Sequence, residues 1–174
     1  MNLELFREMD REMLLTYLEF LLTEHRVVDA FWFLTVEENH GRPVAEKINE
    51  EVWARVVPMS IRDLKSSFHI DEKGLPALER ALRLFPWTTI GGHQVTRTES
   101  ELILTTPRCP PQIARVKRGL GEYGCKEMHQ RVFANTAKEI DPRIRVDCDF
   151  APPDAHPEDL FCRWRFSVSE EGAL

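Results

Sequence analysis

The spacing of hydrophobic residues along the chain changes near Pro86. Before this proline, apolar residues recur every three to four positions, which is the spacing of an amphipathic helix. We predict about five helices there, over residues 3–23, 26–39 and 43–57, in a short segment capped by Ser60, and over residues 76–85. Residues 26–39 are the most apolar and should be buried on more than one side. Pro58 is expected to end the third helix, because a proline disfavours helical geometry in the residue before it.

After Pro86, apolar and polar residues alternate, as they do on a strand with one buried face. We predict four strands, over residues 87–98, 101–106, 143–150 and 160–168. The apolar face carries Cys148 and Phe150 in the third strand. In the fourth strand it carries Cys162, Trp164 and Phe166. A proline-rich loop, APPDAHPED, joins these two runs and predicts that they pair antiparallel. Gly91 and Gly92 should mark a bend or bulge in the first strand.

A helical stretch lies between the second and third strands, over residues 112–140. Three glycines, Gly119, Gly121 and Gly124, interrupt it and predict two helices or a break, because glycine destabilises a helix interior. The chain is therefore predicted to be an α+β protein. An N-terminal helical layer, residues 1–86, precedes an antiparallel sheet of about four strands with a helix packed on one face, residues 87–168, in one compact domain. A frayed tail is expected over residues 169–174.

Composition narrows the classes of function. The net charge of −6 disfavours a general phosphate-binding surface, so we expect no nucleic-acid partner. No apolar run approaches the roughly 20 residues of a membrane span, so no membrane partner is expected. The first twelve residues are too acidic for a secretion signal. Without such a signal, the four cysteines are expected to be reduced thiols of a cytoplasmic protein.

All four cysteines lie between residues 109 and 162 and are the clearest candidates for chemistry. If the proline-rich loop is symmetric about Ala155, Cys148 and Cys162 lie directly across from each other on neighbouring strands. Cys125 and His129 are one helical turn apart and share a helix face, and Cys109 comes just before the helical stretch. The pattern therefore predicts that several soft donors converge between helix and sheet.

Three interpretations of these residues stay open. The cysteines can be buried small hydrophobes, as free cysteines often are. Alternatively, three or four of five side chains hold zinc or another metal that prefers soft ligands; the five are Cys109, Cys125, Cys148, Cys162 and His129. In the third interpretation, Cys125 opens a helix whose N-terminus lowers the thiol pKa, and His129 acts as its base. Arg115 or Arg118 would then hold a substrate carboxylate.

Three runs in the sequence resemble a family of uncharacterised prokaryotic cytosolic proteins. They are FWFLTVEENHG, CPPQIARVKRGLGEYGCKEM and FANTAKEIDPRIRVDCDFAPPDAHPEDLFCRWRF. More distantly, Cys148 and Cys162 with the aromatic strand look like the aminothiazoline-carboxylate hydrolase-like proteins and the vinyl-reductase-like ligand-binding domains. The latter resemblance implies a small-molecule pocket enclosed by an antiparallel sheet and helices, with zinc held by cysteines in some members.

The sequence thus favours a small-ligand or metal-binding protein with a cysteine-lined pocket between the Cys125 helix and the Cys148 and Cys162 strands. Trp164 and Phe166 would wall this pocket, together with Trp32. Two alternatives remain. One is a thiol-dependent hydrolase of a small C–N or C–S substrate. The other is a structural homo-oligomeric partner protein, a homodimer in the simplest case, that pairs through the apolar faces of residues 3–22.

Overall fold

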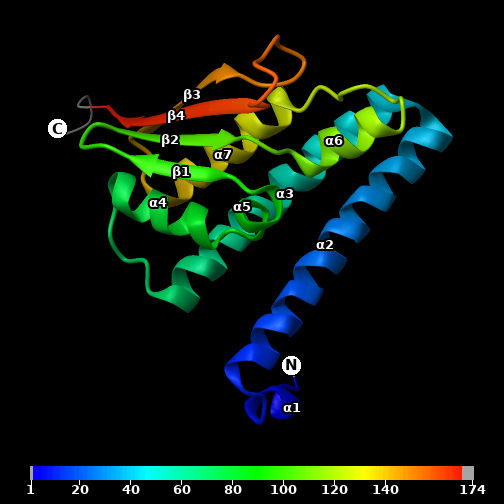
Figure 1. Cartoon of the computed structure of the whole chain (residues 1–174). Helices are drawn as coiled ribbons and strands as arrows, with labels where there is room; N and C mark the ends of the chain where they lie inside the picture. Colours follow the sequence, from blue (N-terminus) through cyan, green and yellow to red (C-terminus); the bar gives the residue numbers. More distant parts are fainter. Residues whose placement is uncertain (1, 170–174) are drawn as a thin grey trace.

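The computed structural model describes residues 2–169 and shows an open four-stranded sheet with helices stacked on one side (Figure 1). The helices are α1 (Glu4–Arg7), α2 (Arg11–His40), α3 (Arg42–Phe68), α4 (Gly74–Leu84), α5 (Pro86–Gly91), α6 (Pro110–Lys117) and α7 (Lys126–Ile140). The strands are β1 (Gln94–Arg97), β2 (Glu101–Thr106), β3 (Ile144–Phe150) and β4 (Cys162–Val168). The predicted α+β class, with its N-terminal helical layer, is confirmed.

The helices form successive layers over one face of the sheet. α7 and α4 pack against the strands, α3 packs on α7, and α2 packs on α3. Trp164 and Phe166 of β4 are fully buried beneath α7, where Phe133 contacts both rings at centroid distances of 5.1 and 5.6 Å. The opposite face of the sheet carries charged pairs such as Arg165 with Asp149. The alternation of the strand residues therefore predicted the buried face of β4 correctly.

The sheet has the order β1-β2-β4-β3, and every neighbouring pair is antiparallel. The pairing of the last two strands is confirmed, but the predicted register is wrong. Cys148 lies across from Trp164, two residues beyond Cys162, because the loop does not fold symmetrically and a bulge follows Cys148. Cys162 instead pairs with Thr106 of β2. A shift of two residues keeps both thiols on the same face but separates them along it.

Two predicted helix boundaries are wrong. The helices expected over residues 3–23 and 26–39 are largely one continuous 30-residue helix, α2, because no glycine or proline interrupts the chain between them. Pro58 lies inside α3 and does not end it. A proline at this position leaves the carbonyl of residue 54 without its helical donor. The side chain of Asn135 on α7 donates to that carbonyl at 3.4 Å, which explains how the packed helix accommodates the proline.

The first predicted strand is only partly correct. Pro86 begins the short helix α5, where a first-turn proline is favourable, and only Gln94–Arg97 forms a strand. Gly92 ends α5 in the left-handed region, with φ of 61°, so the two glycines mark a helix end and not a bulge. The predicted break in the helical stretch is confirmed, since Gly119 and Gly121 lie in a loop between α6 and α7 with positive φ.

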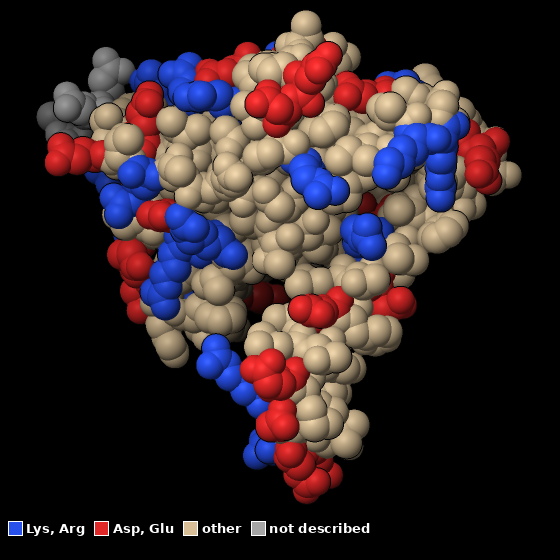
Figure 2. Space-filling model, in the orientation of Figure 1, with Lys and Arg blue, Asp and Glu red and all other residues tan. Residues whose placement is uncertain are grey.

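The first half of α2, with α1, projects from the body as an arm, defined here as residues 3–24 (Figure 1). Its large apolar residues are exposed: Leu3, Leu5, Met13, Leu14, Leu15, Leu18, Phe20 and Leu21. Figure 2 shows the arm as a separate limb, with a hollow between it and the body. None of the described helices combines the length and the apolarity needed to cross a membrane. Of the tail predicted to fray, residues 170–174 lie outside the described part.

Candidate functional site

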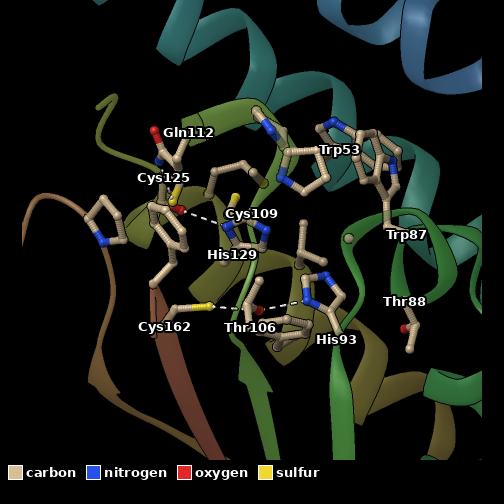
Figure 3. Close-up of a pocket in the computed structure, with 18 of the residues that line it drawn as sticks. Trp53, Trp87, Thr88, His93, Thr106, Cys109, Gln112, Cys125, His129 and Cys162 are labelled. Carbon is tan, nitrogen blue, oxygen red and sulfur yellow. Dashed lines mark hydrogen bonds between the residues drawn. The ribbon is translucent and has the colours of Figure 1, made fainter. Parts of the chain in front are cut away.

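A cavity of about 90 Å³ lies where the N-terminal end of α7 meets the sheet, α3 and α5 (Figure 3). Three of the four candidate thiols line it, those of Cys109, Cys125 and Cys162. Cys148 does not line it, and Trp164 and Phe166 belong to the packed core beside it. A second cavity of about 140 Å³ adjoins it on the side of α2 and α6 and shares several lining residues. We call these the inner and the outer cavity.

The walls of the inner cavity are mainly apolar and come from elements far apart in the sequence. Trp53 comes from α3, Trp87 from α5, and Met128 and Phe133 from α7. The indole rings of Trp53 and Trp87 meet edge to face at 6.1 Å between centroids. Such a chamber, with a few polar groups directed into it, is the usual form of a small-molecule site.

The loop between α6 and α7 forms one wall and is held by side chains, since it has no regular secondary structure. Gln112 is fully buried and bonds the backbone of Tyr123 twice, donating to the carbonyl at 2.9 Å and accepting from the N–H at 3.0 Å. The carbonyl of Pro152 accepts the N–H groups of Cys125 and Lys126, both at 3.0 Å. Sequence reasoning missed Gln112, because a single glutamine in a helix carries no sign of this contact.

Arg115 and Arg118, the predicted carboxylate-binding residues, lie at the outer cavity and not at the thiols. Arg115 is almost completely buried and forms a two-pronged ion pair with Glu37 of α2, at 2.6 and 2.9 Å. The hydrogen bond from Arg115 lowers the pKa of Glu37. Arg115 therefore already has a carboxylate partner and joins α6 to α2, whereas Arg118 is exposed at the end of α6.

Cys125 directly precedes α7, as predicted, but its thiol is not activated. Burial raises its pKa far above the ordinary value, and Gln112 donates to its sulfur at 3.5 Å. His129 bonds the backbone carbonyl of Cys125 through Nδ1, at 3.0 Å, and not the sulfur. That nitrogen must carry the proton, which leaves Nε2 as an acceptor in the neutral ring. The nucleophile and base hypothesis for this pair stays a prediction, and the geometry supplies no sulfur–imidazole hydrogen bond for it.

A second thiol lies in a hydrogen-bonded chain that the sequence did not reveal. The Cys162 thiol donates to the hydroxyl of Thr106 at 3.1 Å, and that hydroxyl lies 2.6 Å from Nδ1 of His93 (Figure 3). Burial lowers the pKa of His93 to about 4, so its imidazole is neutral at physiological pH. Gly91 makes room for this ring, since a Cβ there would lie 2.8 Å from it. The pairing of β2 with β4 creates this contact, and neither strand alone predicts it.

The predicted metal site lacks a set of converging donors. Within residues 2–169, no three side chains of His, Cys, Asp or Glu are grouped closely enough to hold a metal ion. Burial also raises the pKa of Cys109 to about 12 and that of Cys148 to about 11, which opposes the thiolate form that metals bind. All four cysteines are free thiols.

Comparison with known proteins places the chain in a family without an assigned activity. The model of this family, described as a family of unknown function (DUF6125), matches residues 7–168, so the chain belongs to it. Searches of curated proteins and of solved structures gave no match. The resemblance to an uncharacterised family is therefore confirmed. Nothing in these comparisons links the chain to the aminothiazoline-carboxylate hydrolase-like proteins or the vinyl-reductase-like domains.

Proposed function

We propose that this protein binds a small, mostly apolar molecule in the inner cavity. The observation that carries the proposal is the cavity itself, with aromatic walls from three helices and thiol, hydroxyl, amide and imidazole groups directed into it. A concave, mostly apolar pocket with a few polar groups is the usual location of a small-molecule site. An apolar cavity of about 150 Å³ is known to hold a molecule the size of benzene, so the two adjoining cavities suit a ligand of one or two rings.

The polar groups indicate how such a ligand would be oriented. His129 offers an acceptor at Nε2, and His93 offers a donor, because its Nδ1 accepts from Thr106 when the Cys162 thiol donates to that hydroxyl. Both rings are neutral, since burial lowers the pKa of each. The inner cavity is therefore suited to hydrogen-bonded neutral groups and not to an anion. Its free thiols fit the predicted reducing cytoplasm, which stays a prediction.

A substitution that fills the cavity tests this proposal. Thr88 lines the inner cavity, whereas Thr89, next in the same helix, is exposed and does not. Binding of 2-phenylethanol, used as a neutral probe, is measured by tryptophan fluorescence and by calorimetry. We expect Thr88→Phe to abolish binding, because the new ring occupies the ligand volume, and Thr89→Phe to leave it unchanged. Equal affinity in both variants, or no binding to the unaltered protein, would contradict the proposal.

A second candidate function, self-association through the arm, is favoured by a separate observation. Eight large apolar side chains between Leu3 and Leu21 are exposed on the arm, and Leu5 is 66% exposed. Pairing with the arm of a second copy would bury these apolar side chains. The charges near the tip have both signs, so the apolar side chains and not the charges favour the pairing; these charged residues are Glu4, Arg7, Glu8, Asp10, Arg11 and Glu12.

Light scattering coupled to size-exclusion chromatography tests this pairing. The unaltered protein should have the mass of a dimer. The Leu18→Glu variant should be a monomer, because pairing of the two arms would bury the new carboxylate between them. Met59→Glu is the matched control, since Met59 is 60% exposed but lies on α3, outside the arm. A monomeric unaltered protein would rule out this function and leave the cavity proposal standing.

A further inference from the structure

The two cavities meet at a group of polar side chains that the function proposed above does not use. Asp29 of α2, Asn49 of α3 and Trp87 of α5 line both cavities and so lie at their junction. None of them was a candidate in the sequence, because their three helices meet only in the folded protein. Their hydrogen bonding is incomplete, which is unusual for groups at such depth.

Asp29 is a half-buried carboxylate that forms no ion pair within residues 2–169, although the charge of nearby His25 lowers its pKa. It accepts a hydrogen bond from the indole N–H of Trp32, at 3.2 Å, and the side chain of Trp53 also contributes a hydrogen bond that lowers its pKa. Burial raises its pKa, which shows that the carboxylate lacks full compensation for lost water. His25 and Arg26 are the nearest basic residues on the same helix; both are exposed, and neither forms an ion pair with Asp29.

The other two residues leave hydrogen-bonding groups unused. Asn49 is only 4% exposed, yet its side-chain amide has no hydrogen-bond partner within the described residues. The indole N–H of Trp87 is likewise buried and has no partner there. A buried amide that borders a cavity and bonds nothing costs stability unless something else completes it. An N–H donor of a ligand at the junction would complete the Asn49 oxygen, whereas the indole N–H of Trp87 would need an acceptor.

The aromatic surroundings decide which kind of ligand fits beside Asp29. Trp53 and Trp87 present indole rings to the junction, and an indole face attracts an organic cation, most strongly when water is excluded. The imidazole of His25 lies at the edge of these rings, at centroid distances of 6.2 and 5.9 Å. The titratable groups deeper in the inner cavity are neutral histidines and thiols. Asp29 is therefore the group whose negative charge would attract a cationic ligand.

We propose that the junction binds the ammonium group of a small organic amine, held by the Asp29 carboxylate against the indoles of Trp53 and Trp87. The side-chain oxygen of Asn49 accepts a second N–H of the ammonium, and the apolar body of the amine extends into the inner cavity. Arg26 and Arg118 border the outer cavity, so the cation is bound at the junction and not further out. This inference rests on the proposed function and names its class of ligand.

Matched probes test the inference with the full-length protein. 2-Phenylethylammonium and 2-phenylethanol differ only in the charged group, and 3-phenylpropionate supplies the opposite charge. Calorimetry at neutral pH should show the ammonium binding at least about tenfold more tightly than the alcohol, as expected for a charge-assisted hydrogen bond. The carboxylate probe should bind most weakly.

Two variants separate the charge of Asp29 from the net charge of the protein. Asp29→Asn keeps the shape and should abolish the preference for the ammonium while leaving the alcohol bound. Glu24→Gln changes the net charge equally, from an exposed position on the same helix that borders neither cavity, and should keep the preference. Near-ultraviolet circular dichroism checks that both variants are folded.

A second pair of variants tests the indole, in case Asp29→Asn disturbs the fold. Trp87→Leu should weaken the ammonium more than the alcohol, whereas Trp87→Phe, which keeps an aromatic face, should preserve most of the preference. Equal binding of the ammonium and the alcohol to the unaltered protein, or a preference that survives Asp29→Asn, would overturn this inference. Either result would leave the cavity proposal intact, since that depends on the alcohol and on Thr88→Phe.

Discussion

The two ends of the layer between α7 and the sheet are closed in different ways. At the C-terminal end of α7, Ile140 and Ile144 are buried in the apolar core, and the helix end is fixed by Asp141 and Arg143. At the N-terminal end, an irregular loop forms the wall, and Gln112 holds its backbone. Side-chain packing closes the interior of the first end and leaves an open surface groove between α7 and β3, whereas a hydrogen-bonded loop leaves a cavity at the second end. Polar side chains that bond the backbone can therefore keep part of a core open.

Two thiols on the same face of the sheet differ in whether they border the cavity. Cys162 borders the inner cavity at the loop end, while Cys148 lies outside it on the neighbouring strand. Both residues alternate in the same way with polar neighbours. An apolar sheet face therefore does not decide which side chains reach a ligand. The segments that cover the face decide this, and they come from other parts of the chain.

Replacing the glutamine that holds the loop should give the largest effect. Gln112→Ala removes a fully buried side chain and leaves both the N–H and the carbonyl of Tyr123 without their partner, so it should lower the free energy of unfolding by about 3 kcal/mol. Gln130→Ala is the control on the same layer, where one half-buried bond to the carbonyl of Val146 is lost, and should cost about 1 kcal/mol. Urea unfolding measures both. Equal losses would show that the loop end does not depend on Gln112.

Lowering the pH should reduce the stability contributed by the C-terminal end of α7. The hydrogen bond from Arg143 lowers the pKa of the buried Asp141 to about 2, below the value of about 3.9 for an unfolded chain. A depressed pKa stabilises the fold above pH 4, and this contribution disappears as the pH falls towards 2. Because Arg143 is half-exposed, we expect only about 1 kcal/mol. Asp141→Asn should therefore be less stable than the unaltered protein at pH 7, and the gap should close between pH 4 and 2. A gap that persists at pH 2 would contradict this assignment.

Thiol labelling should distinguish Cys148 from Cys109 without any change in stability. Iodoacetamide reacts with thiolates, and burial raises the pKa of all four thiols. Cys148, with a pKa of about 11, should react roughly tenfold faster than Cys109, whose pKa is about 12. Peptide mapping by mass spectrometry gives the order. A fast, selective reaction at Cys125 would reverse this comparison and revive the hydrolase hypothesis.

Sequence reasoning located the region of the site and some of its members. It placed Cys109, Cys125 and Cys162 between helix and sheet, and the structure puts all three at the inner cavity. It also expected Cys148 there and assigned Arg115 to a ligand, although Arg115 pairs with Glu37. Thr106, Gln112 and the junction residues gave no signal, because each acquires its role through a contact with a distant segment.

Most periodic elements and the buried faces of the last two strands followed from the sequence alone, whereas the burial expected for residues 26–39 did not, since only Phe33 of α2 is buried. Helix and strand spacing are local properties, so the α+β order, the break at Gly119 and Gly121 and the inward face of Trp164 could be read directly. Three features became visible only in the folded chain: the register of β3 on β4, the position of Pro58 inside α3, and the convergence of Asp29 with Asn49. They depend on the free energy of contacts between residues far apart in the chain, which the local spacing of residues does not report.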